Sequence, residues 1–334
     1  MSTDQPAPPG MDPAADPVVR AALKAFYQAP VNRYRKLGLK QARLFADVHE
    51  PGPSVGNAAD LAIAGGDRQT LPIRVYRAEA PSGTAIVYLH GGGWALGSVE
   101  SHDGVCRKLC QATAAMVVSV GYRLAPEHPF PAGLMDAHAA AQWVVDQSTE
   151  LGVEPARLVL AGDSAGANLA AALCLRIRDQ GGPPVALQLL IYPALDNSQE
   201  HASLGEHAEA PFLDVADMRW FEGMYARATG AGDPYVWPGL AESLVGLPPA
   251  VIQVAESDAL RDSGVAYAGR LAAAGVAVEL LRYPLYHGFL TITPRAQAAR
   301  QAIADAAARI TDLTPASDLG TGARKGDRQS CSLA

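Results

Sequence analysis

Gly162-Asp163-Ser164-Ala165-Gly166 stands between an apolar run, Arg157–Ala161, and a stretch with helical patterning, Ala167–Leu175. This order predicts a buried strand that turns sharply into a helix, with Ser164 at the tip of the turn. So tight a turn leaves little room for side chains two positions before and two positions after the serine, and glycine fills both. Because small residues of this kind also recur by chance in turns, a reactive role for the serine depends on the rest of the chain.

Length and composition limit the class of protein. The chain has 334 residues, 49% of them hydrophobic and 18% charged, which is enough for a large core. Its net charge of -7 makes it a poor binder of nucleic acid, and its apolar stretches are too short to span a membrane, so neither partner is expected. Four cysteines form neither a disulfide scaffold nor a metal-ligand set. They predict free thiols in a reducing cytoplasm and no bound metal.

Eight short apolar segments have the composition of strands, and from Thr84 onward helical stretches separate most of them. Continuous apolar strands that alternate with helices indicate an α/β fold with a mostly parallel sheet and helices on both faces. The first two strands have no helix between them, which predicts an antiparallel hairpin at that edge. The strands are expected at 59–63, 71–76, 84–90, 116–120, 157–161, 186–192, 250–255 and 277–283, and the helices between and after them at 101–112, 134–147, 167–179, 263–274 and 295–310.

Two segments with helical patterning, residues 18–55 and 196–240, lie outside this alternation of strands and helices. We expect them to form a cap over the carboxyl ends of the strands, where α/β sheets bind ligands. The alternative is two peripheral helical hairpins that only thicken the core. Pro30 divides the first segment into two predicted helices. The predicted boundaries are 1–17 for a disordered N-terminus, 18–55 and 196–240 for the cap, 56–195 and 241–312 for the α/β domain, and 313–334 for a disordered tail.

A glycine-rich loop, His90-Gly91-Gly92-Gly93-Trp94, directly follows the predicted strand 84–90. Consecutive glycines expose backbone amides at a strand end, which suits the binding of a developing oxyanion. The amide of Ala165, next to the serine, is the expected third donor. A merely flexible loop is the alternative, and the position after a strand argues against it.

A base and an acid follow the serine along the chain. His287 comes just after the last predicted strand, where an imidazole can accept and return a proton. Three carboxylates follow the strand 250–255. Asp258 is the expected partner of the histidine, Glu256 is expected to point away, and Asp262 is expected to cap the next helix.

Four motifs in this order resemble those of the bacterial hormone-sensitive-lipase-like (family IV) esterases, in the GDSAG subgroup. They are His90–Trp94 followed by Gly97, then Tyr122–Ala132, Gly162–Gly166 and His287–Phe289. The resemblance covers residues 15–312 and implies an α/β-hydrolase sheet with a helical cap. It also implies carboxylesterase activity on short- to medium-chain acyl esters of small molecules, without a cofactor.

The resemblance implies roles for individual residues. Ser164, Asp258 and His287 match the catalytic triad, in the chain order of α/β-hydrolases. Ala259 departs from the family pattern, which has a proline after the acid. The remaining expected site residues are Gly92, Gly93 and Ala165 as oxyanion donors, and Trp94, Phe212, Leu213 and Phe289 as pocket walls.

Other activities are compatible with the same motifs. An amidase or an acyltransferase would use the same triad. A non-catalytic ligand-binding protein of this fold is disfavoured because every part of the triad is present. The exposed last strand could also pair across a two-fold axis, so a homodimer is possible.

Overall fold

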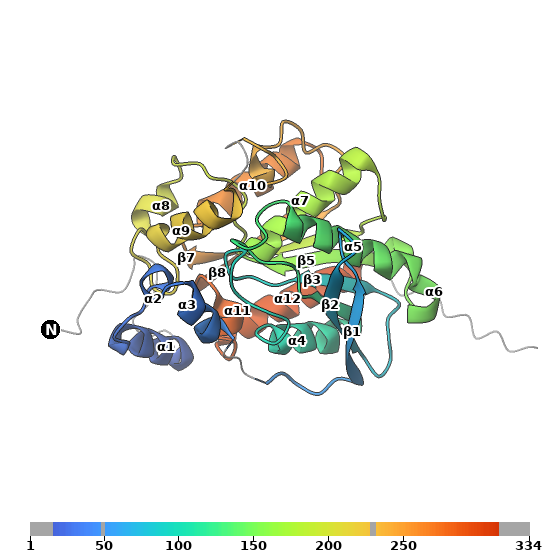
Figure 1. The fold of residues 1–334 in the computed structure, drawn as a ribbon, viewed down its shortest axis with the longest axis horizontal. Helices are drawn as coiled ribbons and strands as arrows, with labels where there is room; N and C mark the ends of the chain where they lie inside the picture. Colours follow the sequence, from blue (N-terminus) through green and yellow to red (C-terminus); the bar gives the residue numbers. More distant parts are fainter. Residues whose placement is uncertain (1–15, 48–50, 228–231, 314–334) are drawn as a thin grey trace, which may run out of the picture.

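The computed structural model describes residues 16–47, 51–227 and 232–313, and its eight strands form one sheet (Figure 1). The strand order is β1-β2-β4-β3-β5-β6-β7-β8. All eight predicted strands are confirmed, within a few residues at their ends. Their bounds are β1 (Asn57–Ala64), β2 (Thr70–Arg77), β3 (Ala85–Leu89), β4 (Met116–Val120), β5 (Leu158–Asp163), β6 (Leu187–Ile191), β7 (Ala250–Ser257) and β8 (Val278–Tyr286).

The sheet is parallel except at its first edge. β1 pairs antiparallel with β2, which confirms the predicted hairpin, and β2 pairs antiparallel with β4. The other neighbours are parallel. Every residue of β3, β4, β5 and β6 is buried, because helices cover both faces of these central strands. Their carboxyl ends therefore meet at one edge of the sheet.

The long helices lie in two layers, one on each face of the sheet (Figure 1). α4 (Asp103–Thr113) and α12 (Gln297–Leu313) pack together on one face, and α5 (Ala132–Asp146) and α7 (Ala165–Gln180) pack together on the other, with α10 (Arg261–Ala273) beside β7. Within the described residues, no helix is both long and apolar enough to cross a membrane.

Short helices from two distant parts of the chain lie side by side at the end of the sheet where the parallel strands finish (Figure 1). The N-terminal part breaks near Pro30 as expected, but it forms three helices rather than two. They are α1 (Pro17–Gln28), α2 (Tyr34–Leu37) and α3 (Leu39–Ala46), and the second part holds α8 (Ala202–Glu206) and α9 (Val215–Tyr225). The remaining short elements are α6 (Ser148–Leu151), η1 (Pro155–Arg157), η2 (Pro238–Leu240) and α11 (Phe289–Ile292).

Buried ion pairs join these two parts. The guanidinium of Arg33 lies 3.1 Å from Asp214, and that of Arg35 lies 2.7 Å from Asp214 and 3.0 Å from Asp217. Both aspartate side chains are only 1% exposed. Removing one partner from a buried pair typically costs about 3–5 kcal/mol, because a charge is left without compensation.

The predicted disordered ends, 1–17 and 313–334, fall almost wholly outside the described residues. Only their inner limits are described, and there Pro17 begins α1 and Leu313 ends α12.

Candidate active site

A strained serine stands where β5 meets α7. Ser164 has φ +54° and ψ -119°, a conformation that lifts its side chain out of the strand-to-helix turn. A Cβ added at Gly166 would lie 1.9 Å from the Leu89 carbonyl oxygen, and one at Gly162 would lie 2.5 Å from the backbone of Gly166. No side chain fits in either place, which is the physical reason for glycine at both positions.

The structure brings three of the predicted residues into one hydrogen-bonded line. His287 Nε2 lies 2.9 Å from Ser164 Oγ, and His287 Nδ1 lies 2.7 Å from Asp258 Oδ2. The second carboxylate oxygen of Asp258 accepts the Leu260 amide at 2.9 Å. This bond fixes the carboxylate without the proline that the family pattern has after the acid. The line can move a proton from a hydroxyl to an imidazole that a carboxylate holds in place.

Strand register places Asp258 beside His287. β7 and β8 run parallel, and their ladder pairs Ser257 with Tyr286, so Asp258 and His287 leave the sheet together. An irregularity in the ladder between Ala255 and Ser257 adjusts this register. Bulges of this kind re-aim side chains at strand ends near active sites.

The two competing carboxylates have other partners. Glu256 pairs with Arg282 at 3.3 Å. Asp262 does not cap a helix, so that prediction was wrong. α10 already begins at Arg261, and the Asp262 carboxylate accepts the Ser203 amide at 2.8 Å and pairs with the Arg261 side chain at 2.8 Å.

The glycine loop faces the serine. Gly92 and Gly93 line the same cavity as Ala165, and their φ values of +120° and +59° belong to the region that favours glycine. None of the described residues accepts a hydrogen bond from the amides of these three residues. Free amides that converge beside a nucleophile can bind the oxygen of a tetrahedral intermediate.

Sequence reasoning missed a buried polar network behind this loop. Asp163, inside the pentapeptide, accepts hydrogen bonds from the Tyr88 hydroxyl (2.8 Å), the Gly91 amide (2.9 Å) and the Tyr192 hydroxyl (3.2 Å). His102 Nε2 lies 3.2 Å from the same carboxylate. Burial alone would raise the pKa of Asp163, but the neighbouring His102 side chain and these hydrogen bonds outweigh it and hold the pKa below its usual range. The carboxylate therefore stays ionised.

This network links the parts of the site. Through Gly91 it holds the glycine loop. Through Tyr192 it reaches His287, because the Tyr192 ring packs edge-on against the His287 ring with centroids 4.9 Å apart. The only advance signal was the position of Asp163 inside the pentapeptide. His90, which opens the glycine loop, is no base candidate, because burial lowers its pKa to about 3.

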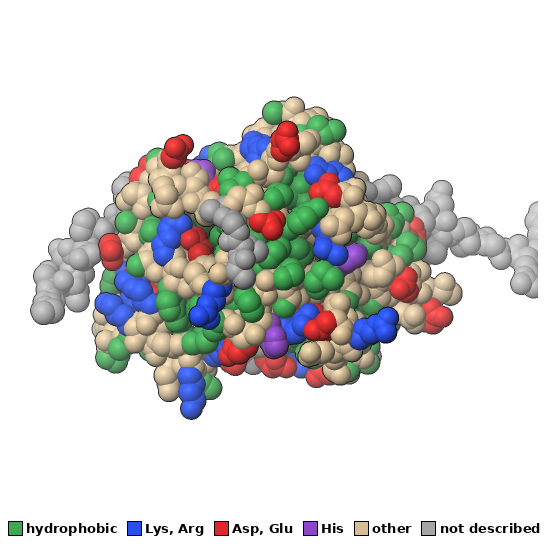
Figure 2. All heavy atoms as spheres, turned by 45° about the horizontal axis from the view of Figure 1, so that its top comes forward, with side chains coloured by type: hydrophobic (Ala, Val, Ile, Leu, Met, Phe, Trp, Pro, Cys, Tyr) green, Lys and Arg blue, Asp and Glu red, His purple; other side chains and the backbone are tan. Residues whose placement is uncertain are grey.

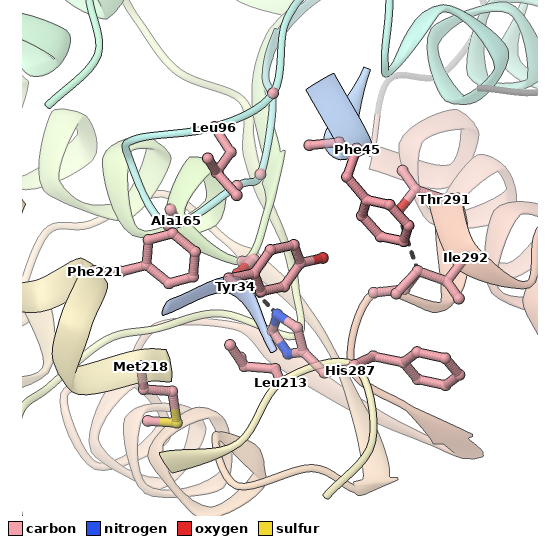
Figure 3. A pocket seen from close by; sticks show the side chains of 18 of the residues that line it. Tyr34, Phe45, Leu96, Ala165, Leu213, Met218, Phe221, His287, Thr291 and Ile292 are labelled. Atoms are coloured by element: carbon pink, nitrogen blue, oxygen red, sulfur yellow. Dashed lines mark hydrogen bonds between the residues drawn. The ribbon is translucent and has the colours of Figure 1, made fainter. Parts of the chain in front are cut away.

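A cavity of about 550 Å³ opens over the serine. Figure 3 shows Phe221 and Met218 of α9 on one side, Phe45, Thr291 and Ile292 on another, and Tyr34 and Leu213 near His287. Tyr34 comes from the N-terminal helices and was not anticipated. Burial raises the pKa of its hydroxyl to about 12, so it stays protonated and can donate a hydrogen bond.

Three of the four predicted pocket residues line this cavity, namely Trp94, Phe212 and Leu213. Phe289 is not among its lining residues, so that prediction is corrected. Gly288 adopts a left-handed conformation that turns the chain after the histidine, and Phe289 packs against Tyr192 in the core. Among the described residues, no cluster of three or more His, Cys, Asp or Glu side chains could hold a metal ion.

Replacing Gly93 with alanine should lower kcat by about 10²–10³, the usual cost of losing one oxyanion donor. The added Cβ would lie 2.3 Å from the Phe221 ring, so the loop must shift. Steady-state kinetics on an acetyl ester measure the effect. Gly269→Ala, which meets nothing within 4 Å, is the matched control and should keep full activity. Unchanged kcat in Gly93→Ala would remove this amide from the oxyanion site.

The strand-to-helix turn, the converging amides and the Ser-His-Asp line define the site of an α/β-hydrolase. A family model described as alpha/beta hydrolase fold matches residues 86–291. Esterase LipI of Mycobacterium tuberculosis is 41% identical over 290 residues, which cover 83% of this chain and 88% of LipI. Carboxylesterase NlhH of the same organism is 40% identical over 306 residues, or 87% and 93% of the two chains.

Solved structures agree with these matches. The hyperthermophilic esterase from the archaeon Pyrobaculum calidifontis superimposes with a TM-score of 0.81 at 36% identity, covering 90% of this chain and 98% of the esterase. This chain therefore belongs to the α/β-hydrolase family, among its hormone-sensitive-lipase-like esterases. It is a carboxylic ester hydrolase.

Proposed function

We propose that this enzyme hydrolyses short- to medium-chain acyl esters of small molecules through a Ser164–His287–Asp258 triad. The observation that carries the proposal is the unbroken pair of hydrogen bonds, 2.9 Å and 2.7 Å, from the serine hydroxyl through the imidazole to a buried carboxylate. A serine hydroxyl is a weak nucleophile until a base accepts its proton, and this arrangement supplies that base.

In the first step, Ser164 Oγ attacks the ester carbonyl while its proton passes to His287 Nε2. The negative charge that forms on the carbonyl oxygen is held by the amides of Gly92, Gly93 and Ala165. Asp258 stabilises the imidazolium and keeps the imidazole in the orientation that the transfer requires. The imidazolium then protonates the departing alcohol, and the C–O bond breaks to leave an acyl-enzyme.

In the second step, water replaces the alcohol. His287 accepts a proton from the water as its oxygen attacks the acyl carbonyl, and the same amides hold the second oxyanion. Collapse of this intermediate returns the proton to Ser164 and releases the carboxylic acid.

The cavity supports small esters as substrates. Its volume of about 550 Å³ lies within the range of about 300–1,000 Å³ that is usual for small-molecule sites, and apolar side chains predominate in its lining. We expect kcat/KM to be highest for p-nitrophenyl esters with short and medium acyl chains and to fall steeply toward palmitate. A rate series from acetate to palmitate tests this, and a maximum at palmitate would contradict it.

Amide hydrolysis and acyl transfer would use the same catalytic residues. Presenting one acyl group in three different substrates distinguishes these two reactions from ester hydrolysis. Butyrate presented as a p-nitrophenyl ester, as an anilide, and as an ester together with an alcohol acceptor gives three rates. Hydrolysis of the ester should dominate. Faster hydrolysis of the anilide would reassign the enzyme as an amidase. An alkyl ester as the main product would reassign it as an acyltransferase.

Two further properties are part of the proposal. Cys106, Cys110 and Cys174 are buried free thiols, and burial raises the pKa of each, which supports a reducing, cytoplasmic setting. β8 forms an edge of the sheet, and a homodimer could pair two such edges across a two-fold axis.

A further inference from the structure

Exposed apolar side chains gather around the mouth of the cavity. Seven large apolar side chains are exposed in the described part of the chain, and four of them belong to the N-terminal helices and their connections. Val31 and Phe45 also line the cavity, so the group adjoins its entrance. We call these four the mouth patch: Tyr27 (54% exposed), Val31 (41%), Leu44 (60%) and Phe45 (64%).

The segment that bears this patch is basic, whereas the rest of the chain is acidic. Residues 16–47 contain seven lysines and arginines against two aspartates, a net charge of +5 in a chain whose net charge is -7. Figure 2 shows Lys and Arg side chains interspersed with apolar ones on the side of the molecule that carries these helices. Charge of this sign beside exposed apolar groups is unusual for a face that meets only water.

The three lysines of this segment are available for a partner. Arg33, Arg35 and Arg43 are held by carboxylates of the same chain. The lysine side chains, by contrast, are exposed and form no ion pair with any described residue. They are Lys24, Lys36 and Lys40.

Helix geometry places cations next to apolar groups. Lys40 and Leu44 are four residues apart in α3, and Lys24 and Tyr27 are three residues apart in α1, so each pair shares a helix face. Lysines beside aromatic and aliphatic side chains are typical of surfaces that lie in a lipid–water interface, where the cations meet anionic headgroups and the apolar groups enter the acyl boundary.

We propose that the mouth patch, with Lys24, Lys36 and Lys40, docks the enzyme on an anionic lipid surface. Resting on the proposed function, amphiphilic esters with short or medium acyl chains then pass from that surface into the cavity without crossing bulk water. This mode needs no membrane-spanning helix, and it revises the expectation from composition that the chain has no membrane partner. A second copy of the chain is a poorer occupant, because a symmetric contact would set the same positive charges against each other.

Co-sedimentation of the full-length enzyme with vesicles tests the docking. One set of vesicles contains phosphatidylcholine alone and the other contains phosphatidylcholine mixed with phosphatidylglycerol. We expect binding to the anionic vesicles, weak binding to the neutral ones, and release by salt, which screens the attraction. No binding to the anionic vesicles would overturn the proposal.

Single substitutions test whether the mouth patch and its lysines are the surface that contacts the vesicle. Each lysine near an anionic membrane contributes roughly fivefold to partitioning, so Lys40→Glu, which reverses a charge, should lower it by more than tenfold. Leu44→Glu should have a similar effect. The controls are Arg68→Glu, an exposed cation on the β1–β2 turn, and Val245→Glu, an apolar side chain that is 62% exposed, and both should bind like the wild type.

Hydrolysis of water-soluble p-nitrophenyl acetate is the separate readout. All four variants should keep the wild-type rate, so loss of docking is distinguishable from loss of folding or of catalysis, and binding is measurable whether or not the proposed substrate class is right. Equal loss of vesicle binding in the controls would contradict the assignment. So would a Leu44→Glu variant that changes oligomeric state while it keeps vesicle binding, since the patch would then face a second copy.

Discussion

Ser164→Ala should lower kcat for p-nitrophenyl butyrate by about 10⁶, the scale of loss when the nucleophile of a serine triad is removed. The fold should survive, because the change deletes one oxygen and keeps the backbone of the turn. Steady-state kinetics measure the loss of kcat, and circular dichroism checks that the variant is folded.

Two further observations sharpen this result. A phosphonate ester that reacts with activated serines should add one adduct mass to the wild type and none to Ser164→Ala. Adding His287→Ala to the serine variant should cost almost nothing more, because the two groups act as a unit. Normal turnover in Ser164→Ala would exclude this serine as the nucleophile.

Asp258→Asn should lower kcat by about 10⁴, because an amide can hold the imidazole in the wrong tautomer and cannot stabilise the imidazolium. Its Oδ2 lies 2.7 Å from His287 Nδ1, and its side chain is 1% exposed, so water cannot replace the lost charge.

Asp262→Asn is the matched control, four residues along the chain. Asp262 contacts Ser203 and Arg261 rather than the histidine. This variant should keep kcat within a few-fold and change only how α8 is held. Equal losses in the two variants, at equal thermal stability, would refute the assignment of the acid.

The α/β class was predictable because its signal is local. Wholly buried parallel strands are continuous apolar runs, and those runs are visible in the chain. The ends of elements were less predictable. β8 continues to Tyr286, beyond Pro284, because an edge strand tolerates a residue that cannot donate to the ladder. The separate short helices α2 and α8 were not predicted either, since four or five residues have too little periodicity to detect.

The juxtaposition of Ser164, Asp258 and His287 was predictable because each of them follows a strand of one parallel sheet. The role of Asp163 was not, because its partners Tyr88, His102 and Tyr192 are brought to it only by the folded sheet. Phe289 was misplaced for the opposite reason. Its closeness to His287 in the chain suggested a pocket wall. The left-handed turn at Gly288 instead directs the Phe289 side chain into the core, away from the cavity that His287 lines.

The ion pairs of Arg33 and Arg35 with Asp214 and Asp217 have a consequence for how molecules enter the cavity. If α1–α3 peeled away alone, two aspartates would be left without countercharges in a poorly hydrated place. If α1–α3 and the segment that holds α8 and α9 move together to open the cavity, the ion pairs stay intact and that penalty is avoided. Trimming the N-terminal helices from an engineered version would then weaken the region around α9 as well, although more than 160 residues of chain separate the two.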